Sequence, residues 1–363
     1  MRLAPASSLS RRQLLVAATA AASALALAAC GSSSSSTASS SDSGLSGTVV
    51  WADYGGPTHK SRDKVFLTPF QKETGVKVTS TTIADAVLAR MLSGGTGDYD
   101  VVQAGVYDIY NHKDDLVALP SGTGTNDVLP ADIRQYALGT FGVGQAQGYL
   151  PATFPDGGPQ SWADFWDFTK FPGKRAIPGV PASFDYMFEA ALLADGVAPD
   201  KLYPMDLTRA VKKLDQLKGH VVFYTEYPQV QQLLASKSAS IAFSPTGQYA
   251  GLRAAGTDVS VTWNQALLAW NVFVIPKGAK NQKNAIALAK DFTDPKKQAA
   301  FAELTNYAPG NQDALQYVPE KTMANLPTAE ANQGKVIDVD DVARAKQYDD
   351  CLKAYGDWLA AAK

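Results

Sequence analysis

The chain has 363 residues, of which 45% are hydrophobic and 19% are charged, and its formal net charge is −2. Because 33 basic residues are balanced by 35 acidic ones, the composition gives no support to a nucleic-acid partner, which would require a basic surface. The chain has only two cysteines, Cys30 and Cys351, so a folded domain that follows Cys30 can form no internal disulfide and must rely on its hydrophobic core.

The first 29 residues predict an export signal. Arg11 and Arg12 precede an apolar, alanine-rich run that reaches Ala29, shorter than the roughly 20 residues that a membrane-spanning helix needs. The paired arginines resemble a twin-arginine signal, and the general export route stays open as the alternative. The sequence Leu27-Ala28-Ala29-Cys30 resembles a lipoprotein cleavage box, which implies that Cys30 carries lipid. A plain signal peptide is the alternative. Residues 30–46 then form a serine-rich tether.

From residue 47, strand and helix patterns alternate. Strands are predicted where short apolar runs lie between turn signals, and helices where apolar residues recur every three or four positions. The predicted strands are 47–51, 76–78 and 99–102, and the predicted helices are 60–74 and 87–92. This alternation indicates an α/β lobe with a mostly parallel sheet. Ligands bind beyond the carboxyl ends of such strands, where Tyr54 and Tyr107 follow the first and third strands.

A second series of elements begins near residue 150. Ser161 is a predicted helix N-cap. Further strands are predicted at 176–177, 221–224, 240–243 and 271–276, and further helices at 184–196 and 229–235. The remainder of the chain has a helical pattern. We therefore expect one lobe from 47–149 with about 272–320, and a second from 150–271 with part of about 321–363.

Five short motifs follow one another between residues 47 and 320. They are Trp51-x-x-Tyr54, Tyr99-Asp100-Val101-Val102, Ser161-Trp162-Ala163-Asp164, the run FVIPKGAKN at 273–281, and Tyr307-Ala308-Pro309-Gly310-Asn311. In this order, behind a lipoprotein-like signal, they resemble the spermidine/putrescine-type solute-binding proteins of ABC transporters.

The resemblance implies an α/β fold of the type II periplasmic-binding-protein class. In this class two lobes, each with a mixed and mostly parallel sheet flanked by helices, are joined by crossing strands and close over one solute. It also implies a monomer without a cofactor, tethered to the outer side of the cytoplasmic membrane. Such a protein delivers its solute to a membrane permease that a cytoplasmic ATPase drives.

The aromatic positions of the family's site match well. A polyamine site needs carboxylates for the ammonium ends and aromatic faces beside the methylenes. The resemblance places Trp51, Tyr54, Tyr107 and Tyr307 at ligand positions, and Gly105 stands where the family often has serine. On this basis Trp51→Ala is expected to weaken binding at least tenfold while leaving the thermal midpoint of the free protein nearly unchanged.

The acidic positions match poorly. The family's crossover aspartate corresponds to Asn271, beside Trp270, and of an acid pair in the second lobe only Asp185 remains. Phe243 is a nearest substitute for a missing tryptophan, and Asp53 is one of the few other acids that could face the cleft. We therefore expect a small solute with an amino or quaternary ammonium group, either polyamine-like or another organic cation. A single cationic end, or a zwitterion such as an amino acid, suits the reduced number of acids better than spermidine does.

Other classes of protein have weaker support. The three histidines are scattered and have no spacing suited to a metal. The glycine-rich stretch at 94–97 lacks the lysine of a phosphate-binding loop, and no serine stands in a nucleophile elbow. A lipid-anchored enzyme on the same fold, and a sensor that presents its solute to a receptor, stay open as alternatives.

Overall fold

The computed structural model describes residues 44–83, 92, 98–123 and 128–363. The predicted export signal, most of the tether, Cys30 and most of the helix predicted at 87–92 lie outside the described residues. Within the described ranges, no helix has the length and apolar character needed to cross a membrane.

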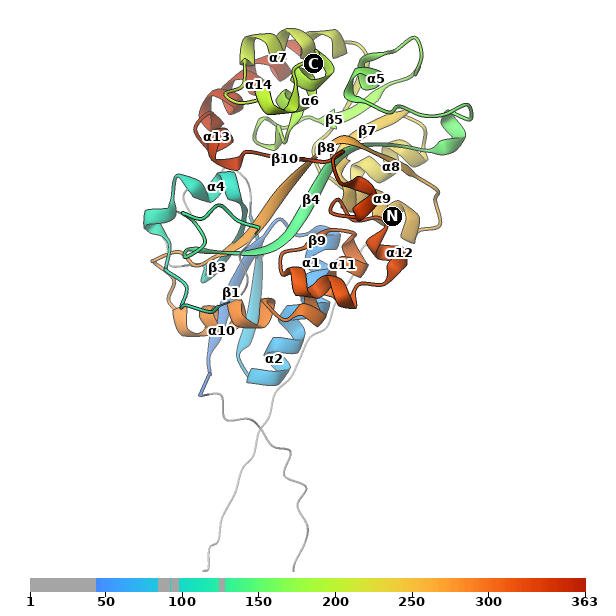
Figure 1. Ribbon diagram of the computed structural model, residues 1–363. Coiled ribbons are helices and arrows are strands. Elements are labelled where there is room, and N and C mark those ends of the chain that lie inside the picture. Colours follow the sequence, from blue (N-terminus) through green and yellow to red (C-terminus); the bar gives the residue numbers. More distant parts are fainter. Residues whose placement is uncertain (1–43, 84–91, 93–97, 124–127) are drawn as a thin grey trace, which may run out of the picture. The chain divides into compact units, whose positions relative to one another are not determined.

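The first elements follow the predicted alternation (Figure 1). They are β1 (Thr48–Asp53), α1 (Gly56–Arg62), a π-helical turn (Asp63–Leu67), α2 (Thr68–Thr74), β2 (Lys77–Thr82), β3 (Val101–Gly105) and α4 (Val106–Tyr110). The helix predicted at 60–74 begins earlier, at Gly56, because Pro57 is well suited to a first helical turn. It ends where Gly75 adopts a left-handed conformation with φ 75°.

Two long strands run through the middle of the fold, side by side (Figure 1). They are β4 (Ala137–Tyr149) and β8 (Ser260–Val274), which pair antiparallel. Neither the strand at 137–149 nor the first part of β8 is predicted from the sequence. Every residue of β4 is buried.

The second series of elements contains the predicted helices and strands in the predicted order, and also two helices, at 207–214 and 246–254, that were not predicted. It comprises α5 (Trp162–Trp166), β5 (Arg175–Pro178), α6 (Met187–Ala194), α7 (Leu207–Leu214), β6 (Val221–Tyr224), α8 (Gln229–Ala235), β7 (Ile241–Pro245) and α9 (Thr246–Ala254). Ser161 is the N-cap of α5, as predicted, and its hydroxyl accepts a hydrogen bond from the backbone N–H of Asp164.

The C-terminal part returns to both regions of the sheet. Its elements are α10 (Gln282–Phe292), α11 (Pro295–Thr305), β9 (Ala308–Pro309), α12 (Glu320–Met323), β10 (Ile337–Asp338), α13 (Asp341–Ala345) and α14 (Tyr348–Ala362). The two short strands extend the sheet, since β9 pairs with β4 and β10 pairs with β8.

The strands of the described residues belong to one mixed sheet, in which β2-β1-β3-β8-β4-β7-β5-β6 is the order of the main strands. The pairs β1–β2, β1–β3, β5–β6 and β5–β7 are parallel, whereas β4 and β8 pair antiparallel with their main neighbours. The parallel strands β1 and β3 therefore end at the same edge, where Tyr54 and α4 follow them.

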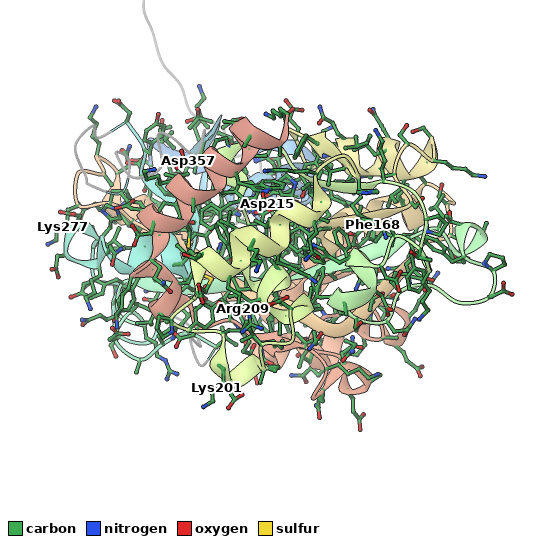
Figure 2. The ribbon with its side chains drawn as sticks, turned by 90° about the horizontal axis from the view of Figure 1, so that it is seen from above. Phe168, Lys201, Arg209, Asp215, Lys277 and Asp357 are labelled. Atoms are coloured by element: carbon green, nitrogen blue, oxygen red, sulfur yellow. The ribbon has the colours of Figure 1, made fainter. Side chains whose placement is uncertain are left out.

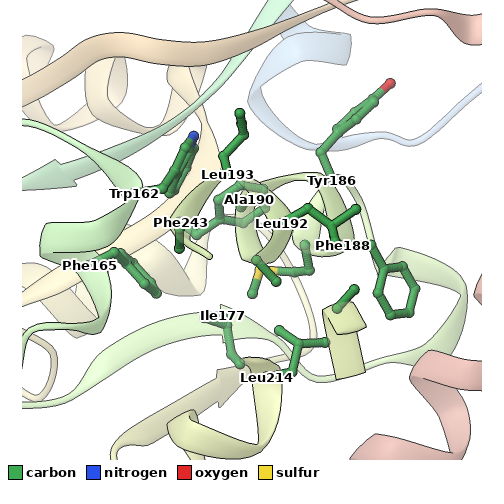
Figure 3. Close-up of a cluster of buried hydrophobic side chains, with 14 of the residues drawn as sticks. Trp162, Phe165, Ile177, Tyr186, Phe188, Ala190, Leu192, Leu193, Leu214 and Phe243 are labelled. Carbon is green, nitrogen blue, oxygen red and sulfur yellow. The ribbon is translucent and has the colours of Figure 1, made fainter. Parts of the chain in front are cut away.

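Two of the hydrophobic cores cover the two ends of the sheet. One gathers around Trp51, Phe66 and Phe292. The other surrounds α6 and includes Trp162 and Phe243, which Figure 3 shows among other apolar side chains. Many charged side chains lie outside these cores, as Lys201 and Lys277 do at the periphery of Figure 2.

Candidate functional site

The candidate site is centred where β3, β8 and β4 lie side by side. Asn271 of β8 pairs with Gly105 on one side and with Phe141 on the other. Its amide oxygen accepts a hydrogen bond from Gln103 Nε2 at 3.0 Å, and its backbone oxygen accepts one from Thr140 Oγ1 at 3.0 Å. These two hydrogen bonds fix the position of Asn271. Its side chain is only half-buried, so part of it is accessible.

Two tyrosines lie at the carboxyl ends of β1 and β3. Tyr107 is in the first turn of α4, and its ring covers Gly105, where a side-chain carbon would lie 2.9 Å from ring atom Cε1. The tyrosine ring thus takes the space of the serine that the resemblance expects. Tyr54 is 36% exposed and interacts electrostatically with Tyr107, whose pKa is raised mainly by burial.

Asp185 reaches the site from the loop before α6. It is 8% exposed, and its Oδ1 accepts a hydrogen bond from the Tyr227 hydroxyl at 2.8 Å. Its backbone has φ 45°, in the left-handed region that residues other than glycine seldom adopt. Strain of this kind is typical of functional sites, since the surrounding structure must maintain it.

Arg344 of α13 joins Asp185 to the tyrosines. The fully buried guanidinium pairs with Glu189 and donates to the backbone oxygen of Asp185. Its carbon atom Cζ lies 4.0 Å from the ring centre of Tyr186 and 4.9 Å from that of Tyr107. The Tyr107 and Tyr186 rings meet edge to face at 6.2 Å. Sequence reasoning missed Arg344, because nothing in its local sequence distinguishes it from a surface arginine.

Tyr307 lies on the other side of Asn271. It is 4% exposed, its ring stacks on Phe141 with centroids 5.1 Å apart, and its hydroxyl hydrogen-bonds with Thr58. The same hydroxyl packs directly against Gly247 in the first turn of α9. Tyr307 therefore connects the elements around α1 with those around α9.

The remaining aromatic candidates lie elsewhere. Trp51 is fully buried, stacked on Phe292 at 5.0 Å. Phe243 is also fully buried, and Figure 3 shows it beside Trp162 in the core around α6. Trp270 neighbours Asn271 on β8, so its side chain points to the opposite face of the sheet. The structure thus brings Tyr54, Tyr107, Asp185 and Asn271 to one region, with Tyr307 at its edge.

The carboxylate of Asp53 is used in hydrogen bonds within the protein. Burial alone would raise its pKa, but His59, the charge of Arg62 and hydrogen bonds from Trp51 and Gly55 lower the pKa to about 2. The donors are Trp51 Nε1 at 2.7 Å, Gly55 N at 2.7 Å, His59 Nδ1 at 2.8 Å, and Arg62 Nη1. A carboxylate with this many donors has little capacity left for an external ammonium group.

Several buried polar atoms near this region have no hydrogen-bond partner among the described residues. They are Gln103 Oε1, Gln145 Oε1, Tyr186 Oη, Ser244 Oγ and Thr246 Oγ1. Gln145 pairs with Pro245 at the end of β7, directly before Thr246. Since buried polar groups are normally hydrogen-bonded, such a group of atoms is suited to a polar solute. Sequence reasoning missed Gln103, Gln145 and Ser244, because neutral polar residues on a strand give no local signal of a site.

A metal centre has no support in the described ranges of the chain, where no three His, Cys, Asp or Glu side chains are grouped to hold an ion. The site therefore offers aromatic faces, the carboxylates of Asp108 and Asp185, the guanidinium of Arg344, and neutral hydrogen-bonding groups. These are means of holding a small polar molecule.

Comparison with known proteins identifies the class. Residues 66–331 match the family model described as bacterial extracellular solute-binding protein. A gamma-aminobutyric acid-binding protein of Pseudomonas aeruginosa is 28% identical over 77% of this chain and 81% of its own length. The putrescine-binding periplasmic protein SpuD of the same species is 27% identical over 74% of this chain and 79% of its own.

A solved structure shows the same fold. The structure of the Atu4243-GABA receptor superposes with a TM-score of 0.77 and 30% sequence identity, covering 86% of this chain and 97% of that chain. The periplasmic-binding-protein fold expected from the sequence is thus confirmed, and so is the general class of function. The chain belongs to the bacterial extracellular solute-binding protein family and is a solute-binding protein of an ABC transporter.

Proposed function

We propose that this protein captures a small organic solute with one ammonium group and delivers it to its membrane permease. The observation that carries this proposal is that Arg344 contacts the Tyr107 ring and donates to the backbone oxygen of Asp185, so an acid from the second series of elements lies near the tyrosines. A carboxylate pairs with the ammonium charge, and an aromatic face contributes about 0.5–2 kcal/mol of further attraction.

The charge of the site favours one cationic end over two. A diamine needs a carboxylate at each end, but Asp53 is already engaged by Arg62, and residue 271 is an asparagine. The other end of the solute would meet neutral groups, among them Asn271 and the hydroxyl of Thr246 at the start of α9. Helix N-termini favour negative charge, so a zwitterion such as an ω-amino acid suits this end.

A diamine is the second candidate, because one relative is named for putrescine. The relative named for gamma-aminobutyric acid favours the first candidate. In both cases the protein would hold its solute without transforming it.

In this proposal, the binding of the solute is coupled to closure of the two predicted lobes. In this proposal the two predicted lobes turn about β4 and β8, and the solute stabilises the state in which both sets of contacts form. Contacts of that state are the edge-to-face pair Tyr107–Tyr186 and the packing of Tyr307 on Gly247. Trp51 and Phe243 would support the site from the two cores rather than touch the solute.

Isothermal titration calorimetry tests the solute class. The panel comprises gamma-aminobutyric acid, putrescine, spermidine, choline and a dicarboxylate. We expect a member with one ammonium group to bind at least about tenfold more tightly than spermidine, a difference of about 1.4 kcal/mol. Asp185→Asn should abolish that preference. Binding of the dicarboxylate alone would contradict the proposal, as would binding of no member with an ammonium group. Native mass spectrometry of the purified protein would then show whether its own solute is recovered unchanged.

We also propose that the mature protein is anchored by lipid on Cys30. The support is sequence alone: a cleavage box before Cys30 and a serine-rich tether after it. Metabolic labelling with a fatty acid should mark the full chain, and Cys30→Ser should lose the label and release the protein from membranes. A labelled Cys30→Ser variant would contradict lipidation at this residue.

A further inference from the structure

A cavity of about 470 Å³ lies on the face of β8 opposite to the candidate site. Trp270 and Leu268 of β8 line one side, and residues 338–342 of β10 and α13 line another. Trp270 points into this cavity because it alternates with Asn271, whose side chain belongs to the candidate site. The cavity therefore lies on the other face of β8 from the Asn271 side chain, and its volume is within the 300–1,000 Å³ range of small-molecule sites.

The walls of this cavity are rigidly built. Strand β10 pairs in parallel with β8, and the N–H of Val339 donates to the backbone oxygen of Leu268 at 3.2 Å. Trp270 packs close to β4, where a side-chain carbon at Gly142 would lie 2.9 Å from ring atom Cζ3. The indole and the acidic segment are thus fixed to the two long strands of the sheet.

The polar side chains that line the cavity are mainly acidic. They include Asp338, Asp340 and Asp341, and no lysine or arginine is among the described residues that line it. Asp340 caps α13, since its Oδ1 accepts from the N–H of Ala343 at 2.9 Å. Asp338 is exposed and makes no such contact among the described residues. Of the three carboxylates, only that of Asp340 caps α13, and those of Asp338 and Asp341 do not.

Asp341 is the unusual member of this group. It is only 5% exposed, and its Oδ1 has no hydrogen-bond partner in the described part of the chain. Burial raises its pKa, and Arg344 opposes that effect, while Asp108, Glu189 and Asp340 add to it. Arg344 itself pairs with Glu189. Because burial favours the neutral form of Asp341, an ammonium ion that enters the cavity would stabilise the ionised form, and the indole of Trp270 would add cation–π attraction.

We propose that this cavity is a second binding site, which takes a small organic ammonium ion between the face of Trp270 and the carboxylate of Asp341. The indole contributes cation–π attraction to the ammonium, and Leu129, Leu268 and Val339 contact its carbon substituents. Asp338 at the exposed side supplies a further negative charge. This proposal does not depend on which solute occupies the first site.

Choline is the probe, because it is a compact quaternary ammonium ion, and dimethylbutanol, in which carbon replaces the nitrogen, is its neutral counterpart. The protein is labelled with fluorotryptophan, and Trp270→Phe assigns the signal of Trp270 among the six tryptophans of the chain. We expect choline to shift this signal in a saturable manner. The neutral counterpart should bind at least about tenfold more weakly.

Three variants separate this site from the first one. Asp341→Asn should weaken the choline response of Trp270 about tenfold, and Asp349→Asn, at an exposed position of α14, should leave it unchanged. Tyr54→Ala should also leave it unchanged. The proposal is overturned if the Trp270 signal does not respond to choline, if Asp341→Asn responds like the wild type, or if Tyr54→Ala abolishes the response.

Discussion

Asp53 shows how one buried carboxylate determines the response of the fold to acid. Its pKa is lowered to about 2 from 3.8, so the folded state holds the ionised form more strongly than the unfolded chain does. A shift of this size contributes about 2 kcal/mol to the free energy of unfolding. The contribution is complete above the unfolded pKa of 3.8 and is lost as pH falls toward 2.

The variant Asp53→Asn tests this pH dependence. At pH 7 it should lower the free energy of unfolding by about 3–5 kcal/mol, because it leaves Arg62 buried without a carboxylate. Between pH 4 and pH 2 the difference from the wild type should shrink by about 2 kcal/mol. Urea unfolding at several pH values measures both quantities, with the exposed Asp349→Asn as control. A difference that stays constant with pH would contradict the assignment.

Trp51 and Tyr54 are only three residues apart but have different environments. Trp51 is fully buried, whereas Tyr54 is 36% exposed. Burial changes the result that the resemblance predicts for Trp51→Ala. We now expect that variant to lower the free energy of unfolding by about 3–5 kcal/mol. Tyr54→Ala should instead weaken solute binding about tenfold with little change in stability. Thermal unfolding and calorimetry on the two variants check the pair, and the reverse pattern would place the ligand against Trp51.

At the scale of elements, how well the sequence predicts a segment depends on how local its signal is. Strand β6 and helix α8 agree with their predicted ranges of 221–224 and 229–235, because a compact apolar run and a clear period mark them. The N-cap at Ser161 is equally local. Strand β4 was missed because it contains four glycines, which normally indicate loops.

The glycines of β4 are required by its neighbours in space. A side-chain carbon at Gly148 would overlap the ring of Tyr249, and one at Gly139 would lie 2.9 Å from Val128 Cγ2. These contacts come from residues distant in sequence, so no local pattern reveals them. The same limit applies to the candidate site: its tyrosines were found by resemblance, whereas Arg344 and Gln103 reach it only through tertiary packing.

A glycine pair tests this explanation of β4. Gly148→Ala should lower the free energy of unfolding by about 1–3 kcal/mol, because the methyl group must displace the buried ring of Tyr249. Gly356→Ala is the matched control: this helical glycine of α14 has only an ordinary contact, 3.6 Å from Pro181 Cβ. It should raise the free energy of unfolding by about 1 kcal/mol. Urea denaturation gives both values, and two changes of the same sign would disprove the packing argument.

At the scale of the whole molecule, contacts on both sides of β4 and β8 hold its regions together. Asn111 of the segment after α4 donates to the backbone oxygen of Ala345 at 3.0 Å, near the Tyr107–Tyr186 ring pair. On the other side Tyr307 packs on Gly247. If the protein works by closure as proposed, these contacts form together with solute binding, and a change that blocks one of them should reduce affinity.

Gly247→Ala is the variant that tests this idea, because its methyl group would overlap the hydroxyl and ring of Tyr307. We expect solute affinity to fall about tenfold, with little change in the thermal midpoint, since the clash affects the closed state alone. Adding Tyr307→Phe removes the overlapping hydroxyl and should restore part of the affinity, whereas Tyr307→Phe alone should have a smaller effect. Calorimetry on the single and double variants measures this coupling. If the effects of the two substitutions on the binding free energy are simply additive, the proposal of closure at this contact is wrong. The affinity lost in Gly247→Ala would then come from direct contact with the solute, and solute binding would not be coupled to the packing of α9 against Tyr307.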